Sequence, residues 1–469
     1  MQQAQDQEKQ TKKFITMTQT PVKKLILKLA VPTMVSMMIT SIYNMADTFF
    51  VGQISGSEAT SATAAVGVAF PLMAIIQAFG FMFGHGSGNY ISRALGKQEV
   101  GDAEKMAATG FFMALLAGLL LTILGLVFLE PLAILLGSTQ TILPHAKSYI
   151  SLILIGCPWM TASLVLNNQL RFQGNALFSM IGIASGGLLN IALDPLLIFG
   201  LDLGIRGAAL ATIISQFVSF SLLFIGTWKS DNLKIRFRNF NPRPRFLWEM
   251  FKGGAPSLFR QGIGSVATTC LNNAAAVFGD PAIAAMSIVS RVMMFANSLV
   301  IGFGQGFQPV CGFNYGAKKY GRVREGYRFC VKYSVLFLLC AAVVGEIFAP
   351  QLISLFRRDD AEVIRIGALA LRLQCIMLPS FGFQVISSMM LQTSAQTLRA
   401  SVLALARQGL FFLPLVLILP PMMGLLGIQL AQPISDVISF IVALVVVSDS
   451  LKKIKALDLE QQELEQEKA

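Results

Sequence analysis

The sequence is poor in charge and in histidine. Asp, Glu, Lys and Arg make up only 13% of the 469 residues and histidine occurs twice, whereas 54% of the residues are hydrophobic. With a mean hydropathy of +0.64, this usage excludes an ordinary soluble domain. The six cysteines have no metal-ligand spacing, so we expect small packing residues. His85 and His145 are expected to be surface residues and not ligands.

A signal peptide is also missing. The polar start MQQAQDQEKQTKKF lacks the short apolar core and the small-residue cleavage site of a secretory leader. The first long apolar run is therefore expected to remain as an uncleaved anchor.

Long apolar runs dominate the chain instead. A helix needs about 20 apolar residues to cross a hydrocarbon core of about 30 Å. Because the runs are long and continuous, they predict helices and not the alternating segments of about 10 residues found in β-barrels. Twelve spans are predicted, at residues 25–51, 63–90, 106–129, 148–170, 178–200, 206–228, 250–276, 282–310, 327–349, 363–390, 402–421 and 427–448.

The positive charges are distributed by loop, within a net charge of +12. Alternate loops carry most of them, at Lys23, Lys24, Arg93, Lys97, Lys105, residues 229–246, Lys318, Lys319, Arg322, Arg324, Lys452, Lys453 and Lys455. The opposite loops chiefly carry Lys147, Arg206, Arg357 and Arg358. By the positive-inside rule, both termini are predicted to be cytoplasmic and the protein to lie in the cell membrane. A nucleic-acid patch is disfavoured because no interleaved aromatics accompany these charges on a soluble fold.

An internal repeat relates the two halves. Glycines at 84, 86, 96 and 101 recur at one constant offset as glycines at 304, 306, 316 and 321, and each set is followed by basic residues. An internal duplication explains this match better than chance. Since six spans per half is an even number, the halves re-enter the bilayer in the same direction. The sequence thus predicts an all-α membrane protein of two six-helix bundles, related by a pseudo-twofold axis along the membrane normal.

The duplication and the polar segments divide the chain into five parts. We predict a cytoplasmic N-terminal segment at 1–24, a first bundle at 25–228, a basic, proline-bearing cytoplasmic linker at 229–249, a second bundle at 250–448 and a cytoplasmic tail at 449–469. The acidic, glutamine-rich tail is typical of a solvated helix or of disorder.

Two aspartates stand in apolar stretches of the first bundle. A charge near the centre of a membrane helix costs about 2.5–3.5 kcal/mol to insert, so it is a functional candidate by default. Asp47 lies in TSIYNMADTFFVG, where Tyr43 and Asn44 precede it by about one turn and share its helical face. Asp194 lies in LNIALDPLLIFG, one turn after Asn190.

Pro195 follows Asp194 directly. Proline has no backbone N–H, so the carbonyl of Ile191 is expected to lose its helical partner and to become an acceptor beside the carboxylate. The same residue favours a local helix bend.

Depth adds a further constraint on this site. Asp47, Asp194 and Thr212 are each predicted to lie within one or two helical turns of the same level in the outer leaflet. Carboxylates, an amide oxygen, a hydroxyl and a released carbonyl are hard ligands suited to Na⁺, and the two carboxylates are equally a proton-binding pair. The alternative is that each aspartate merely caps or bridges helices near the interface, an interpretation that is stronger for Asp47 than for Asp194.

The second half is chemically different. At the positions corresponding to Asp47 and Asp194 it carries Leu271 and Leu415, so the acidic pair is not repeated. Other charges in or near spans could pair with each other, line a water-filled cavity or snorkel, namely Arg260, Arg291, Glu346 and Asp436.

Several motifs resemble those of the multidrug and toxic compound extrusion (MATE) transporters. They are YNMADTFFVG in the first span, RFQGN at 171–175, LNIALDPLLIFG in the fifth span and GIRGAALAT in the sixth. APSLFRQG at 255–262 and IVSRVMMF at 288–295 resemble the prokaryotic, DinF-like branch of this family. The resemblance covers essentially the whole membrane region.

The resemblance implies a twelve-helix antiporter that exports drugs or organic cations, as in xenobiotic transport and antibiotic resistance, in exchange for H⁺ or Na⁺. It implies no resident cofactor, no enzymatic activity and a monomer in the membrane lipid. By motif, Asp47, Asn190, Asp194 and Thr212 match the family's first-lobe ion site, which makes them candidate Na⁺ ligands. Tyr43, Asn44 and Asn167 are supporting candidates, and Asn167 ranks lower because its predicted depth is nearer the cytoplasmic end.

Two other functions are consistent with parts of this pattern. A lipid-linked saccharide flippase of the same superfamily is the nearest alternative, although more cationic residues would be expected along its central cleft. An intramembrane aspartyl protease also uses paired membrane aspartates, one as base and one as acid. Its glycine-x-glycine-aspartate signature is absent, and twelve duplicated spans exceed its needs.

Overall fold

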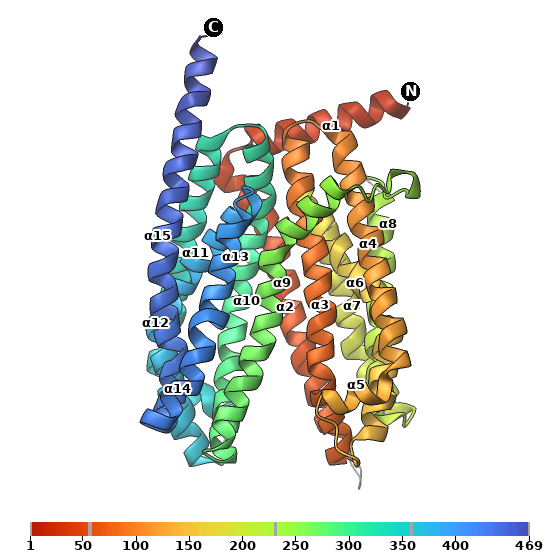
Figure 1. Ribbon diagram of the computed structural model, residues 1–469, viewed down its shortest axis with the longest axis vertical. Coiled ribbons are helices and arrows are strands. Elements are labelled where there is room, and N and C mark those ends of the chain that lie inside the picture. The colour runs from red at the N-terminus through yellow and green to blue at the C-terminus, as the bar shows by residue number, and fades with distance from the viewer. Residues whose placement is uncertain (1, 55–58, 229–231, 357–359, 468–469) are drawn as a thin grey trace. The chain divides into compact units, whose positions relative to one another are not determined.

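The computed structural model describes residues 2–54, 59–228, 232–356 and 360–467, and these residues are almost entirely helical (Figure 1). Each of the twelve predicted spans coincides with a helix or with two or three joined helices, so the predicted all-α architecture is confirmed. In the first half the helices are α2 (Val22–Gly52), α3 (Ala59–Gly96), α4 (Val100–Val127), α6 (Leu143–Phe172), α7 (Ala176–Pro195) with the π-helix η1 (Leu196–Gly200), and α8 (Gly204–Trp228). In the second half they are α9 (Pro244–Ala276), α10 (Asp280–Gly316), α11 (Tyr320–Ser354), α12 (Ala361–Thr393), α13 (Thr397–Leu405) with the π-helix η3 (Ala406–Phe412) and α14 (Leu413–Met423), and α15 (Leu425–Gln466).

Most of these helices extend beyond the apolar runs that predicted them. Within the described ranges, eleven are long and apolar enough to cross a membrane. The helix left out is α9, which covers the predicted span 250–276. Its sequence is diluted by Arg260, Gln261, Asn272 and Asn273, so its hydropathy falls although its length suffices.

The segments outside the spans are also largely helical. Residues of the predicted N-terminal segment form α1 (Gln2–Gln19), and a short helix, α5 (Leu129–Leu135), follows α4. The C-terminal tail is a continuation of α15, which extends past the ends of its neighbours α11 and α12 (Figure 1). Arg357 and Arg358, and residues 229–231 of the predicted linker, lie outside the described residues.

Two compact units make up the chain. The first comprises Met1–Thr16 and Val35–Gln261, and the second comprises Met17–Met34 and Gly262–Ala469. In the first unit α6 packs against α3, α4 and α8, and α7 packs against α8. In the second unit α12 packs against α10, α11 and α15, and α14 packs against α15. The same pairs of spans therefore pack in both halves, as a duplication requires.

The fourth span of each half is the centre of its bundle. The most apolar stretch of α6 is 67% buried and that of α12 is 61% buried, more than in the other spans described. Small residues allow this close packing. A Cβ on Gly118 of α4, for example, would lie 2.7 Å from Pro158 Cα of α6.

The backbone repeats the duplication at three turns. Residues in the left-handed region occur in pairs whose offset matches that of the repeated glycines to within one position: Gln98 and Lys318, Gly174 and Ala395, and Gly204 and Gly424. The helix-ending hydrogen bonds repeat with them, since Glu99 N donates to Ala94 O at 2.8 Å and Lys319 N donates to Asn314 O at 2.8 Å. These turns establish which residues of the two halves correspond to each other.

Three helices belong to both units. The boundaries fall inside α1, between Thr16 and Met17, inside α2, between Met34 and Val35, and inside α9, between Gln261 and Gly262. Glycines bring α2 and α9 into backbone contact with their neighbours. A Cβ on Gly86 of α3 would lie 2.1 Å from the carbonyl oxygen of Met250 of α9, and a Cβ on Gly306 of α10 would lie 2.4 Å from Ala30 Cα of α2. Gly86 and Gly306 are one of the repeated glycine pairs, so both contacts derive from the duplication.

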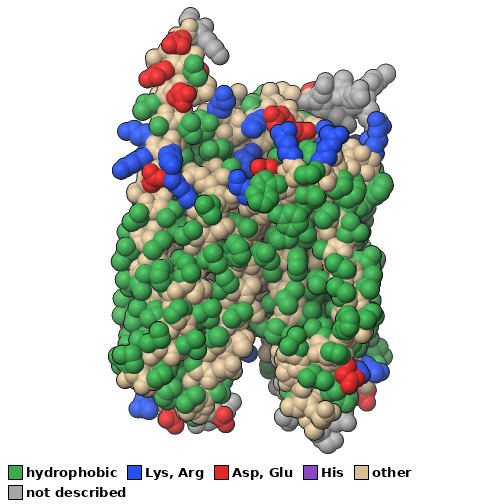
Figure 2. All heavy atoms as spheres, viewed as in Figure 1, with side chains coloured by type: hydrophobic (Ala, Val, Ile, Leu, Met, Phe, Trp, Pro, Cys, Tyr) green, Lys and Arg blue, Asp and Glu red, His purple; other side chains and the backbone are tan. Residues whose placement is uncertain are grey.

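Each unit has an apolar outer surface. Figure 2 shows hydrophobic side chains over the middle of both units, with Lys, Arg, Asp and Glu gathered toward their ends. On α4 the exposed apolar residues include Leu116, Leu119, Leu120 and Ile123, and on α11 they include Leu336, Leu339, Val343 and Ile347. Such extensive exposed apolar surface is typical of a protein whose solvent is the lipid bilayer.

Candidate functional site

The first unit contains a pair of interacting carboxyl groups. Asp194, on α7, is fully buried, and Asp47, on α2, is half-buried. The two carboxylates lie close enough to interact electrostatically. The helices of the first and fifth spans therefore bring together the two aspartates that the sequence predicted to converge.

These carboxylates are incompletely hydrogen-bonded. Asn190 Nδ2 donates to Asp194 Oδ1 at 3.2 Å, one turn away on α7 as predicted. Within the described part of the chain, Asp194 Oδ2 and Asp47 Oδ1 are buried and accept no hydrogen bond. Because a buried carboxylate without a partner is costly, each of these oxygens is a position where a bound cation or proton would be stabilised.

Aromatic hydroxyl groups surround the pair. Tyr149, on α6, is 3% exposed, and its hydroxyl interacts electrostatically with both Asp47 and Asp194. Tyr43, one turn before Asp47, interacts with that aspartate and with Gln216 of α8. The ring of Tyr43 also lies against α7, because its Cδ1 is 3.0 Å from the position of a Cβ on Gly187. Helices α2, α6, α7 and α8 thus all contribute to the site.

The helix that carries Asp194 changes its hydrogen-bond pattern immediately after the aspartate. α7 ends at Pro195 and η1, a π-helix, begins at Leu196. Leu201 N donates to Leu196 O at 2.9 Å, across five residues instead of four. A proline followed by a π-helical turn places the carboxylate at an irregular, adaptable point of the span, and π-helical turns are frequent at functional sites.

The other sequence candidates are placed differently. Thr212, on α8, donates its hydroxyl to its own helix at Ala208 O, at 3.1 Å. Asn44 is exposed, although it is on α2 as predicted. Asn167 donates to Ser179 Oγ at 2.6 Å. Since Ser179 precedes Asp194 by about four turns of the same helix, Asn167 lies roughly 22 Å from the acid pair along the bundle.

The second unit has no acid pair at the corresponding positions. Leu271 is 8% exposed and belongs to the apolar core of this unit, against which Leu415 also packs. The structure thus agrees with the sequence prediction that the second half has apolar side chains where the first half has the two aspartates.

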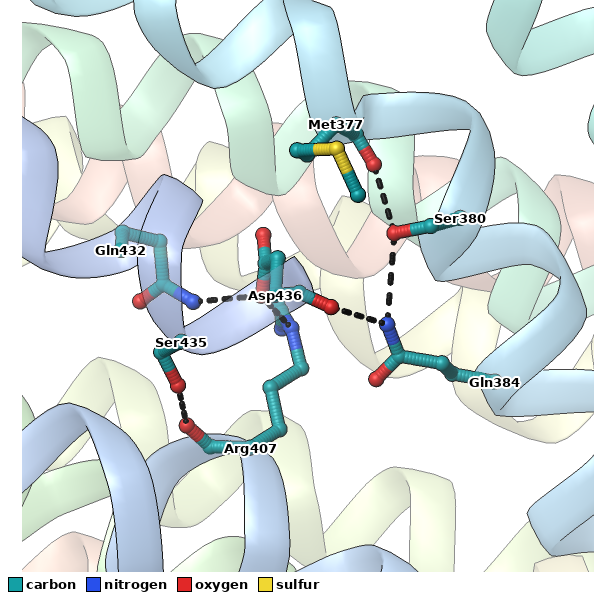
Figure 3. A network of polar contacts seen from close by, with 7 residues as sticks. All are labelled: Met377, Ser380, Gln384, Arg407, Gln432, Ser435 and Asp436. Carbon is teal, nitrogen blue, oxygen red and sulfur yellow. Dashed lines mark hydrogen bonds and ion pairs between the residues drawn. The ribbon is translucent and has the colours of Figure 1, made fainter. Parts of the chain in front are cut away.

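A different polar network lies in the second unit (Figure 3). Asp436, on α15, pairs with Arg407, the second residue of η3, through Arg407 Nε and Asp436 Oδ1 at 2.7 Å. Gln432 Nε2 donates to the same carboxylate oxygen at 2.8 Å, and Gln384 Nε2, on α12, donates to the backbone carbonyl of Asp436 at 3.3 Å. The network is closed by Ser435 Oγ, which donates to Arg407 O at 2.5 Å.

Arg407 is therefore a partner of Asp436 that sequence reasoning missed. Among the other charges expected in or near spans, Arg291 is exposed, and the carbonyl of Glu346 accepts a hydrogen bond from Arg372 Nε at 3.1 Å. An ion pair between two different helices, whose members are distant in the chain, carries no local sequence signal.

The expectation for His85 is wrong. Its side chain is 1% exposed, with Nδ1 3.2 Å from Phe81 O and Nε2 3.3 Å from Arg171 Nη2. The glycines around His85 allow α6 and α9 to pack closely on α3, and this packing buries the ring. Arg171 also donates to Asn168 Oδ1 at 2.6 Å and is itself 1% exposed.

The hydrogen bond from Asn190 to Asp194 can be tested by substitution. In Asn190→Ala, the ionised carboxylate loses its only protein donor among the described residues, and a hydrogen bond to a charged group contributes about 1.5–3 kcal/mol. We expect the apparent affinity for the coupling ion to change by about tenfold or more. Initial drug efflux rates measured over a series of coupling-ion concentrations check this. Asn44→Ala, which removes an exposed amide beside the same site, is the control and should leave the ion dependence unchanged.

Comparison with known proteins supports the family resemblance. The model of the MatE family matches residues 32–196 and 256–418, one segment in each half. The multidrug export protein MepA of Staphylococcus aureus is 28% identical over 430 residues, covering 91% of this chain and 94% of that protein. Its counterpart from Staphylococcus haemolyticus is 27% identical over 427 residues, covering 90% and 93%.

Solved transporter structures share the fold. A MATE protein in complex with MaL6 matches with a TM-score of 0.87 and 26% identity, covering 94% of this chain and 99% of that one. An outward-facing multidrug resistance MATE transporter of the MOP superfamily also gives 0.87, at 26% identity, covering 94% and 98%. A MOP superfamily transporter from Pyrococcus furiosus, described as having a binding pocket of reversed polarity, gives 0.86 at 27% identity over 94% and 98%.

The family model matches a long segment of each half, and the shared fold extends over nearly the whole chain. This protein is a multi-pass membrane transporter and not an enzyme, and it belongs to the MatE family.

Proposed function

We propose that this protein is a secondary active exporter of drugs and other organic cations, driven by the inward movement of H⁺ or Na⁺. The names of its relatives in Staphylococcus support the export of multiple drugs. The observation that carries the ion coupling is the buried Asp194 carboxylate, which interacts with Asp47 and keeps Oδ2 without a hydrogen-bond partner in the described structure.

The acid pair is the proposed ion site. A proton would be held between the two carboxylates. Sodium would instead be held by oxygens of Asp47, Asn190 and Asp194, and by Thr212 after its hydroxyl leaves Ala208 O. Both ions relieve the repulsion between the carboxylates, which favours a repacking of α2, α7 and α8 at the flexible turn after Pro195. In this scheme the repacked state is the one that releases the drug outward.

The membrane placement is part of the proposal. Both termini are cytoplasmic by the positive-inside rule, the protein functions as a monomer in the cell membrane, and no resident cofactor or nucleic acid takes part.

The decisive experiment determines whether H⁺ or Na⁺ is the coupling ion. Purified protein is reconstituted in vesicles loaded with ethidium, and a pH gradient and a sodium gradient are imposed one at a time. We expect efflux to accelerate with one gradient and to stop when it is collapsed. An efflux rate that is unchanged by either gradient would contradict ion coupling. Absence of dye export, together with accumulation of a lipid-linked saccharide precursor in deletion cells, would favour the flippase alternative.

A further inference from the structure

The second unit keeps a buried carboxylate in a place that the duplication relates to the first unit's ion site. Gly204 and Gly424 precede α8 and α15 in the left-handed region, at the offset of the repeated glycines. In this register Gln432 corresponds to Thr212, and Asp436 corresponds to Gln216. Gln432 therefore takes the position of a proposed ion ligand, and Asp436 takes that of the residue that contacts Tyr43 in the first unit.

The arginine that pairs with this carboxylate occupies a position that is a glycine in the first unit. Gly174 and Ala395 mark the turns before α7 and α13, and in the register that they set Arg407 corresponds to Gly186. In the first unit a Cβ on Gly186 would lie 2.8 Å from Ser219 Cβ and 3.1 Å from Ser215 O, which leaves no space for a side chain. In the second unit the corresponding helix contact is kept by a side chain, since Ser435 donates to the backbone carbonyl of Arg407.

The two units balance their charges in different ways. In the first unit, Asp47 Oδ1 and Asp194 Oδ2 have no hydrogen-bond partner among the residues described. In the second unit, Asp436 accepts from Arg407 and Gln432, and the guanidinium lies 4.6 Å from the ring centre of Phe381. The side chains of Arg407 and Asp436 are only 19% and 6% exposed, so the pair is held largely out of water and each group is the main partner of the other.

We propose that the Arg407 guanidinium is an intramolecular counter-cation of Asp436. It neutralises this carboxylate in the second unit as the coupling ion neutralises the acid pair in the first. Asp436 is then a cation site with a permanent, covalently attached occupant, and it takes up no ion from solution. The comparison with a coupling ion rests on the proposed function. The occupancy of Asp436 by Arg407 does not, and it can be tested without transport.

The test removes the guanidinium of Arg407 by substitution and then supplies free guanidinium as a small cation. Arg407→Ala shortens the side chain and leaves Asp436 with Gln432 inside a cavity that has lost the guanidinium. We expect purified Arg407→Ala protein to bind radiolabelled guanidinium with one site per chain at low-millimolar concentration, and its thermal midpoint to rise as guanidinium is added. Wild type should show neither effect, because its site is already filled.

Two further variants keep this test specific. Arg407→Met with Asp436→Leu replaces the pair by apolar side chains, which is often tolerated, and should bind no guanidinium. Arg407→Lys retains a cation and should also bind none. Guanidinium binding to Arg407→Ala that disappears in the double variant supports the proposal. An Arg407→Ala protein that is folded but does not bind guanidinium overturns it, as does equal binding by the double variant. If the gradient experiment fails while guanidinium still binds, only the comparison with a coupling ion is lost.

Discussion

Asp194→Asn is expected to abolish gradient-driven drug accumulation. The substitution preserves the size of the side chain but removes the charge that we propose binds the coupling ion, and it leaves the carboxylate of Asp47 in place. One elementary charge moving down about 100 mV supplies about 2.3 kcal/mol, which corresponds to an accumulation ratio of about 40-fold for an uncharged substrate. That ratio should fall to about one in the variant.

The measurement needs a suitable substrate and a matched control. A monovalent cationic drug cancels the electrical term in a one-for-one exchange, so an uncharged substrate, or a chemical gradient without a potential, should be used. Asp202→Asn changes an exposed aspartate a short distance further along the chain and should leave coupled efflux intact. Coupled efflux at the wild-type rate in Asp194→Asn would refute the role of this residue.

Gly86→Ala is expected to prevent correct packing of α3 against α9. The added Cβ would lie 2.1 Å from the backbone oxygen of Met250, and a backbone atom cannot rotate away as the end of a side chain can. Overpacking a well-packed contact costs about 1–3 kcal/mol, and we expect this substitution to reach at least the upper end of that range.

Thermal unfolding followed with a thiol-reactive dye can measure this effect, because Cys157 of the first unit is buried and free. Gly67→Ala is the control, since it makes the same change in the same helix where no atom lies within 4 Å of the new Cβ. Its unfolding midpoint should equal or exceed that of wild type, because alanine is the better helix former. Equal midpoints for the two variants would show that the close approach at Gly86 is not required.

Much of the fold could be predicted from composition and spacing. Apolar runs predicted all of the long helices because a bilayer requires length and hydrophobicity, and eleven of the described helices meet both requirements, whereas α9 meets only the first. The glycines at 84, 86, 96 and 101 revealed the duplication by their constant offset, and at Gly86 the backbone contact with α9 leaves no space for a side chain. The helix ends were less predictable. Polar residues continue α2, α10 and α15 beyond the apolar runs, where hydropathy gives no signal.

The site was predictable where its residues are neighbours in the sequence or are charges at the same predicted depth, as Asp47 and Asp194 are. Asn190 and Asp194 are one helical turn apart, so their contact follows from spacing alone. Tyr149 lies between them and Asp47 in the chain, and nothing in its own segment distinguishes it from an ordinary interfacial aromatic. Arg407 could be assigned to Asp436 only after the packing of η3 on α15 was known. Thus chemistry within one helix can be predicted from sequence, whereas chemistry between helices depends on packing.

Within the membrane spans, α2 and α9 each cross from one unit to the other as continuous helices. Any rearrangement of one unit against the other must therefore twist or bend these two helices. Each of them has a proline just before the boundary, Pro32 in α2 and Pro256 in α9, where one backbone hydrogen bond of the helix is lost. Asp47 is also on α2, roughly 22 Å or about four helical turns beyond Pro32. If the proposed ion binding at Asp47 shifts α2, the helix is expected to bend at this weak point.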